Sequence, residues 1–284
     1  MRISYISACA AASTALFDLV LAIPTAKDST AKRGIMIKRA ARNDLTTNFI
    51  PVFKDLTTAV PVDTGLISSD THDTYDPVAC ATVCLGLVDP ECVFFNIFVL
   101  ATPESDPASV NTCQYYSQVF GIADATVADD GTPEHTISQS SGYRKIPDST
   151  EFTEESFNDA SIAAPASDND PYMGCTKSTG TTEITKDDCI AKCVAKTQDN
   201  SKNHVSADNT YRPCNFVNVY QNLLDGEPDG WSCCYYTQSY GVEYATNKES
   251  WDTSDPKRHK TKANSYGYSL EPQLGADGVV TLTN

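Results

Sequence analysis

The stretch CQYYSQVFGIADAT at residues 113–126 returns later in the chain as CCYYTQSYGVEYAT at residues 233–246. The two stretches align without a gap, and seven of the fourteen positions are identical. Two shorter motifs precede each copy in the same order, namely C-x3-C at 80–84 and 189–193, and C-x-F-x-N-x-aromatic at 92–98 and 214–220. Three motifs repeated in one order predict a duplicated domain, and the unequal segments between them predict variable loops instead of a solenoid.

Each C-x3-C motif is expected on a helix that packs against a sheet. Asp76 suits an N-cap and Pro77 the first helical position, while Thr185 caps the second helix with Asp188 three residues on. Cysteines four residues apart then share one helix face. The C-x-F-x-N-x-aromatic motifs are rich in β-branched and aromatic residues, which predicts strands buried on both faces.

The pairing of the cysteines follows from this arrangement. A helix with two cysteines on one face must lie on the sheet that supplies their partners. The short loop between Cys84 and Cys92 favours a disulfide between these two residues. The expected bridges are Cys80–Cys113, Cys84–Cys92, Cys189–Cys233 and Cys193–Cys214. Neighbouring strand residues point to opposite faces, so Cys234 cannot reach the helix that Cys233 reaches, and Cys175 remains as its partner. Each bridge is expected to contribute about 2–4 kcal/mol to stability.

These residues resemble the core of PAN/apple domains, in which a helix with C-x3-C is bridged to two following strands. The C-x-F-x-N-x-aromatic motif followed by Cys-x-Tyr-Tyr-Ser/Thr-Gln is similar to a family of secreted fungal proteins with two such domains, some labelled fruit-body-specific. The resemblance covers about residues 45–270. It implies an α+β fold of two tandem disulfide-bonded PAN/apple-like domains, each a small antiparallel sheet with one helix. The pair Cys175 and Cys234 and the loop 248–262 depart from the family pattern.

Domain boundaries are expected where the composition changes. The first PAN/apple-like domain spans 40–147, a linker 148–170, the second domain 171–272, and a tail 273–284. The linker is rich in Ser, Ala, Asp and Glu and has no sustained period. The tail fits either a closing strand or a frayed end, and the sequence leaves both open.

The first 22 residues have the features of a secretory signal peptide. Arg2 precedes a stretch rich in Ala, Leu and Val, and Asp18 and Pro24 interrupt it before it reaches the length of a membrane span. Residues 23–39 form the expected propeptide, which ends at the dibasic pair Lys38-Arg39, a site of the kind that kexin-type proteases cut. The mature chain would therefore begin at residue 40.

The remaining cysteines support the same compartment. Of 11 cysteines Cys9 leaves with the signal, and the ten that remain are an even number, as expected in an oxidising space. A structural zinc site is not expected, because the two C-x3-C units lie far apart in the chain. We expect no metal and no cofactor.

Charge and motifs limit the possible functions. The net charge of −16 argues against nucleic acid and against an anionic membrane as the main partner. H-E-x-x-H, G-x-S-x-G, a glycine-rich phosphate loop and a dinucleotide fingerprint are all absent from the sequence, so no catalytic residue is predicted. His72 beside Asp73 could form a dyad, but an exposed loop ahead of the first helix is the favoured interpretation.

Three groups of residues are candidates for binding. Asn96 and Asn218 are interpreted as buried amides that bond to loop backbone, in preference to ligand contacts. The basic run 257–262 fits an anion-binding loop, a second processing site or a solvated hairpin. The third group is a set of tyrosines that either stack on sugar rings or belong to the core: Tyr115, Tyr116, Tyr235, Tyr236 and Tyr240.

The sequence therefore predicts a secreted, extracellular or wall-associated recognition or adhesion protein. The resemblance implies a carbohydrate or protein ligand bound through loops and sheet faces. Two alternatives stay open, a secreted hydrolase with an active site between the domains and a developmental or host-directed signalling factor. Carboxyl groups with a raised pKa in a cleft would favour the hydrolase, whereas exposed aromatic residues on corresponding faces of both copies would favour adhesion.

Overall fold

The structure is a computed structural model that describes residues 45–62, 65–102, 109–129, 135–165 and 170–283. The predicted signal peptide and propeptide, including Lys38, Arg39 and Cys9, lie outside the described residues. The fold of the described residues is α+β and rich in antiparallel sheet, as expected from the sequence.

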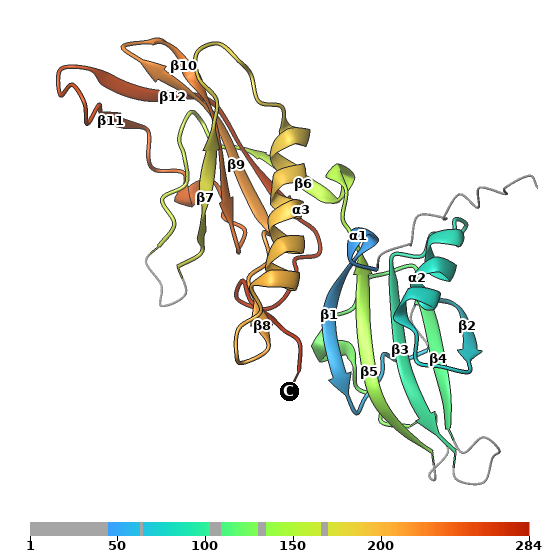
Figure 1. The fold of residues 1–284 in the computed structure, drawn as a ribbon. Helices are drawn as coiled ribbons and strands as arrows, with labels where there is room; N and C mark the ends of the chain where they lie inside the picture. The colour runs from blue at the N-terminus through green and yellow to red at the C-terminus, as the bar shows by residue number, and fades with distance from the viewer. Residues whose placement is uncertain (1–44, 63–64, 103–108, 130–134, 166–169, 284) are drawn as a thin grey trace, which may run out of the picture. The chain divides into compact units, whose positions relative to one another are not determined.

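The first sheet has the strand order β1-β5-β3-β4-β2, and helix α2 lies across one of its faces (Figure 1). Its elements are α1 (Leu45–Asn48), β1 (Phe49–Leu56), β2 (Leu66–His72), α2 (Pro77–Gly86), β3 (Phe94–Ala101), β4 (Ser109–Tyr116), η1 (Ile122–Asp124) and β5 (Thr136–Lys145). The predicted start of α2 is confirmed, because Asp76 accepts from the Val78 and Ala79 backbone N–H groups. Cys80 and Cys84 face the sheet and are buried with Phe95 and Ile97.

The second sheet has the order β11-β12-β9-β10-β7, with β6 paired to β12. Its elements, with the connecting segments, are η2 (Ser149–Glu151), β6 (Phe152–Ser156), β7 (Tyr172–Lys177), α3 (Lys186–Asn203), β8 (Thr210–Tyr211), β9 (Phe216–Leu224), β10 (Glu227–Tyr236), η3 (Val242–Tyr244), β11 (Glu249–Trp251), β12 (His259–Leu270) and β13 (Val280–Thr281). Helix α3 begins as predicted, because the Thr185 hydroxyl accepts from the Asp188 backbone N–H at 3.1 Å.

The two sheets share one topology. Strands β1, β5, β3, β4 and β2 correspond in order to β6, β12, β9, β10 and β7, and α2 corresponds to α3. Within the segment 148–170, predicted to be a linker, residues Phe152–Ser156 form β6, the outermost strand paired to β12. Phe152 and Phe157 lie on either side of the polar residues of β6, and both are buried. These two apolar contacts hold the segment against the sheet, although its overall composition is polar.

The tail and β1 contribute contacts that join the two halves of the described chain. The tail contains β13, which pairs with β8, so it is a closing strand and not a frayed end. The Tyr211 hydroxyl donates to the Pro51 carbonyl at 2.8 Å, and the Lys54 N–H donates to the Leu282 carbonyl. Ile50 of β1 and Val194 of α3 belong to one buried apolar cluster. One buried apolar cluster therefore contains residues of both sheets.

Ten cysteines form five disulfides in the described part of the chain. The bridges are Cys80–Cys113, Cys84–Cys92, Cys175–Cys234, Cys189–Cys233 and Cys193–Cys214, which are the same pairs that helix spacing and strand alternation predict. Four of them hold a helix, two to strands β4 and β10 and two to the residues just before β3 and β9. The fifth, Cys175–Cys234, joins β7 to β10 and has no counterpart in the first sheet.

Candidate functional site

A cavity of about 450 Å³ lies on the face of the first sheet that points away from α2. Strand alternation defines this face, because Ile97 and Cys113 pack toward the helix while Phe98 and Thr112 point the other way. The sheet residues that line the cavity are Phe98, Leu100, Thr112, Gln114 and Ile137, and the residues of the covering segments are Ala59, Val60, Val62, Val127 and Asp129. This volume is in the usual range for small-molecule sites.

Polar and apolar groups are separated across the cavity. Leu100 of β3 lies opposite Ile137 of β5, which makes one side apolar. On the other side, β4 supplies Thr112 and Gln114, and the Gln114 Oε1 accepts from the Tyr116 hydroxyl at 2.7 Å. A bound molecule would meet aliphatic and aromatic carbon on one side and hydrogen-bonding groups on the other.

Asn96 holds one covering segment of the cavity in place. Its Oδ1 accepts from the Val60 backbone N–H at 3.0 Å, and its Nδ2 donates to Ser140 Oγ at 2.9 Å and to the Ser141 carbonyl at 3.0 Å. Asn96 is fully buried. Its interpretation as a buried amide that bonds to loop backbone is confirmed, and its role here is to position Val60 over the sheet.

The equivalent surface of the second sheet is polar. Asn218 makes the matching bond to the Ile162 N–H at 3.0 Å, so the frameworks of the two faces agree. The side chains of the two faces differ at the equivalent positions. The changes from the first sheet to the second are Phe98 to Tyr220, Leu100 to Asn222, Thr112 to Ser232, Gln114 to Cys234 and Ile137 to Lys262. Asn222 Nδ2 donates to Ser232 Oγ at 2.9 Å. The Lys262 ammonium donates to Asn247 at 3.0 Å, and partial burial lowers the pKa of Lys262.

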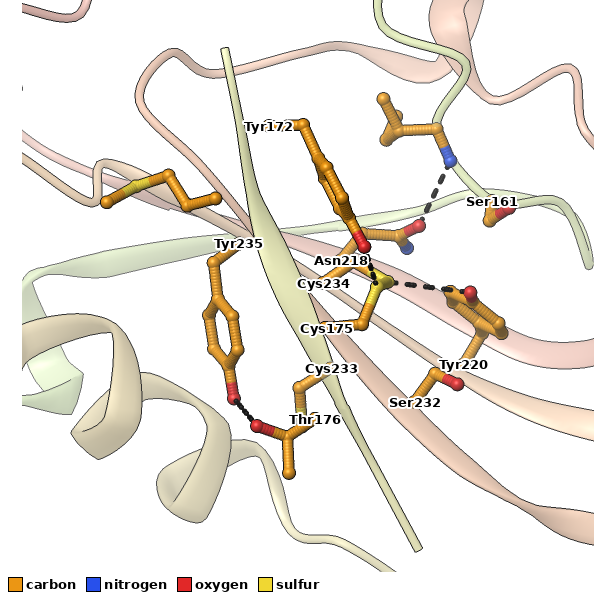
Figure 2. Close-up of a disulfide and its surroundings, with 12 residues drawn as sticks. Ser161, Tyr172, Cys175, Thr176, Asn218, Tyr220, Ser232, Cys233, Cys234 and Tyr235 are labelled. Atoms are coloured by element: carbon orange, nitrogen blue, oxygen red, sulfur yellow. Dashed lines mark hydrogen bonds between the residues drawn. A yellow bond between two sulfur atoms is a disulfide. The ribbon is translucent and has the colours of Figure 1, made fainter. Parts of the chain in front are cut away.

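The cystine Cys175–Cys234 occupies this second face, between two tyrosine hydroxyls (Figure 2). The Tyr172 hydroxyl lies 3.1 Å from Cys175 Sγ, and the Tyr220 hydroxyl lies 3.5 Å from Cys234 Sγ. Burial raises the pKa of Tyr220, so this residue keeps its proton near neutral pH. Sequence reasoning identified the bridge but did not identify the hydroxyls around it.

The five candidate tyrosines are core residues and not exposed platforms. All of them are buried, with at most 6% of the residue exposed: Tyr115, Tyr116, Tyr235, Tyr236 and Tyr240. Burial is also the main reason for the raised pKa of Tyr235 and Tyr236. The exposed aromatic residues on the second half are Tyr172, Tyr244 and Trp251, which the repeat motifs did not single out.

The basic run 257–262 is matched by acidic groups. Arg258 Nε lies 3.0 Å from Asp225, His259 Nε2 lies 3.1 Å from Glu249, and Lys260 Nζ lies 3.2 Å from Asp252. Hydrogen bonds from Ser254 hold the pKa of Asp252 at about 2, so its carboxylate stays charged at neutral pH. Because Arg258 and Lys260 have anionic partners already, the hairpin is a weak candidate for a polyanion site.

His72 lies on β2 and not in an exposed loop, because the strand extends to residue 72 and pairs there with Asn111 of β4. Its Nε2 lies 3.1 Å from Asp70, so Asp73 is not its partner. His72 also lies near the sulfurs of Cys80 and Cys113. Those two sulfurs form a disulfide, so neither is a thiolate that could bind a metal.

Carboxylates that line a hollow beside Arg144 form ion pairs and turn contacts. Arg144 is buried and donates to Glu151 at 2.7 Å and to the Pro272 carbonyl at 2.8 Å. Nearby, hydrogen bonds from Thr150 lower the pKa of Asp148. A glycosidase acid needs a raised pKa, so the shift of Asp148 has the opposite sign.

Among the described residues, no helix combines the length and the apolar character needed to cross a membrane. Comparison of the chain with protein-family models, with curated proteins and with solved structures finds no match.

Proposed function

We propose that this protein is a secreted recognition protein built from two PAN/apple-like domains, the first at 40–147 and the second extended from 171–272 to include β6 at Phe152–Ser156. The repeated strand order, and the helix bridged twice to each sheet, support this assignment. Five disulfides are typical of proteins from an oxidising extracellular compartment.

Secretion with processing makes a direct prediction about the mature N-terminus. The protein recovered from the medium of a secreting host is expected to begin at residue 40, because cleavage follows Lys38-Arg39. N-terminal sequencing checks this. A variant with Lys38→Gln and Arg39→Gln should keep the segment 23–39 on the secreted protein. Extracellular wild-type protein that still carries Met1 or the intact dibasic pair would contradict the proposal.

The observation that carries the recognition role is the cavity on the first sheet. The second sheet has the same strand order and the same asparagine bond, but polar side chains stand where the cavity has apolar ones. The fold therefore does not require an apolar hollow at this place. We assign the cavity to ligand binding.

The lining defines the chemistry of the ligand. Seven of the ten lining residues are apolar, so the body of the ligand is apolar. Thr112 and Gln114 offer hydrogen bonds at one side. The Asp129 carboxylate and the acidic chain disfavour an anion. The occupant is accordingly a small apolar molecule with a neutral or cationic polar end, a narrower class than the carbohydrate or protein expected from the resemblance.

Binding of N-phenyl-1-naphthylamine, a neutral apolar fluorophore, tests this assignment. The secreted protein is expected to bind it saturably, and to bind the anionic 1-anilinonaphthalene-8-sulfonate more weakly. Ile137→Lys introduces the lysine that the second sheet carries at the equivalent position, Lys262. The variant should bind the fluorophore at least about tenfold more weakly, because it places a charge on the apolar side of the cavity.

Thr136→Lys is the matched control for this experiment. Thr136 is the exposed neighbour of Ile137, so the variant carries the same added charge outside the cavity. It should bind the fluorophore like the wild type. The assignment fails if the two variants bind equally, or if the wild type shows no saturable binding.

A further inference from the structure

Cys175 differs from every other cysteine of the described chain in its exposure. It is half-buried on β7, the edge strand of the second sheet, whereas each of the other nine bridged cysteines is at most 4% exposed. Attack on a disulfide needs access for the incoming thiolate along the sulfur–sulfur axis. The exposure of Cys175 therefore distinguishes Cys175–Cys234 from the other four bridges.

The pairing of β7 with β10 does not depend on this bridge. Cys175 lies directly opposite Cys234, and Thr176 and Lys177 continue the ladder beside it. In the first sheet, β2 pairs with β4 in the same way, with Ser69 opposite Gln114 and no disulfide. The fold therefore forms at this place with or without a cystine, and opening the bridge need not unfold the sheet.

The hydroxyls beside the bridge are suited to stabilise a leaving thiolate. The Tyr220 hydroxyl lies 3.5 Å from Cys234 Sγ, and the Tyr172 hydroxyl lies 3.1 Å from Cys175 Sγ (Figure 2). A phenol that keeps its proton can donate to a thiolate and so lower the pKa of that thiol. In the first sheet, Phe98 stands at the position equivalent to Tyr220, and Gln114 stands at the position equivalent to Cys234. The hydroxyl and the cystine therefore occur together in the second copy and are both absent from the first.

We propose that Cys175–Cys234 is a thiol–disulfide exchange site for small-molecule thiols of the extracellular space. An external thiolate attacks Cys175 Sγ, a bond forms between the two sulfurs, and the Cys175–Cys234 bond breaks. Cys234 leaves as a thiolate that accepts a hydrogen bond from the Tyr220 hydroxyl. A second external thiolate then attacks the external sulfur of the mixed disulfide. This step releases the Cys175 thiolate, so two external thiols are oxidised to one disulfide and one protein disulfide is reduced.

Graded exposure of the secreted protein to glutathione tests this proposal. Thiols are trapped with iodoacetamide at successive times, and the labelled cysteines are identified by peptide mapping. Cys175 and Cys234 are expected to be labelled first, at least about tenfold faster than any other pair. Maps of the alkylated protein made without reduction should find the glutathione adduct on Cys175. Opening of another bridge at an equal rate, or an adduct mainly on Cys234, overturns the proposal.

Tyr220→Phe separates a chemical role of the hydroxyl from a packing role. The variant should fold, because Phe98 occupies this position in the first sheet, and it should slow exchange about fivefold by removing a donor to the leaving thiolate. Tyr235→Phe is the control, since its hydroxyl bonds to Thr176 and not to a sulfur. If both variants change the exchange rate equally at unchanged thermal stability, the hydroxyl of Tyr220 has no special role and the proposed mechanism is wrong.

Discussion

Replacing Asn218 with alanine is expected to lower the free energy of unfolding by about 3 kcal/mol. The amide is fully buried and makes three hydrogen bonds, to the Ile162 N–H at 3.0 Å, to Ser265 Oγ at 3.1 Å and to the Tyr266 carbonyl at 3.1 Å. Alanine leaves a buried backbone donor and a buried acceptor unpaired, and each costs free energy because water cannot replace the lost partner.

Asn96→Ala should cost a similar amount, because Asn96 makes the equivalent bonds in the first sheet. Urea unfolding of each variant provides the measurement. Asn222→Ala is the matched control on the same strand as Asn218. Asn222 is only half-buried and bonds to Ser232 at 2.9 Å, so its loss should cost less than about 1 kcal/mol. Equal losses for Asn218→Ala and Asn222→Ala would show that burial of the amide is not the cause.

The second large loss of stability is expected when a side chain is added at Gly142 or Gly267. A Cβ built at Gly142 lies 2.5 Å from Cζ of Phe53 and 2.7 Å from Cζ of Phe94. A Cβ at Gly267 lies 2.6 Å from a ring carbon of Phe157 and 2.8 Å from one of Phe216. All four rings are buried, so none can move without disturbing the core.

Gly142→Ala and Gly267→Ala should therefore each lower the free energy of unfolding by about 2–3 kcal/mol. Gly86→Ala, at the last residue of α2, is the control because a Cβ there has no neighbour within 4 Å. It should change stability by less than about 0.5 kcal/mol, or raise it slightly through better helix propensity. Thermal unfolding compares the three variants. A loss at Gly86 as large as that at Gly142 would remove the steric explanation.

Together these variants test whether the two sheets obey one set of packing rules. Asn96 and Asn218 hold equivalent segments, and Gly142 and Gly267 admit equivalent pairs of phenylalanine rings. The repeated residues of the sequence are therefore those that build the framework. The residues that differ between the copies, such as Ile137 and Lys262, lie where the two faces differ in chemistry.

Short-range sequence patterns were sufficient to predict the helix starts and strands that lie within the repeated motifs. Asp76 and Thr185 mark the helix starts because an N-cap depends on a few neighbouring residues. Alternation along a strand separates Cys233 from Cys234, so it also assigns their different partners. These features depend on short-range geometry, which is why the sequence predicted them.

Features that depend on distant segments were decided by the tertiary structure. Composition predicted a linker over 148–170, but pairing with β12 makes part of it a strand. Arg258 pairs with Asp225, 33 residues away in sequence, so the basic run is matched in a way that its own residues do not indicate.

The sequence by itself determined the duplication, the helix starts, the principal strands and the cysteine partners, because each depends on periodicity and spacing within a copy. The tertiary structure alone decided that the tyrosines are core, that a cavity opens beneath Val60 on the first sheet, and that the Tyr220 hydroxyl lies beside Cys234. The physical reason is that burial and cavities arise where side chains from several separate segments meet, and the shape left between them is not encoded in any one segment.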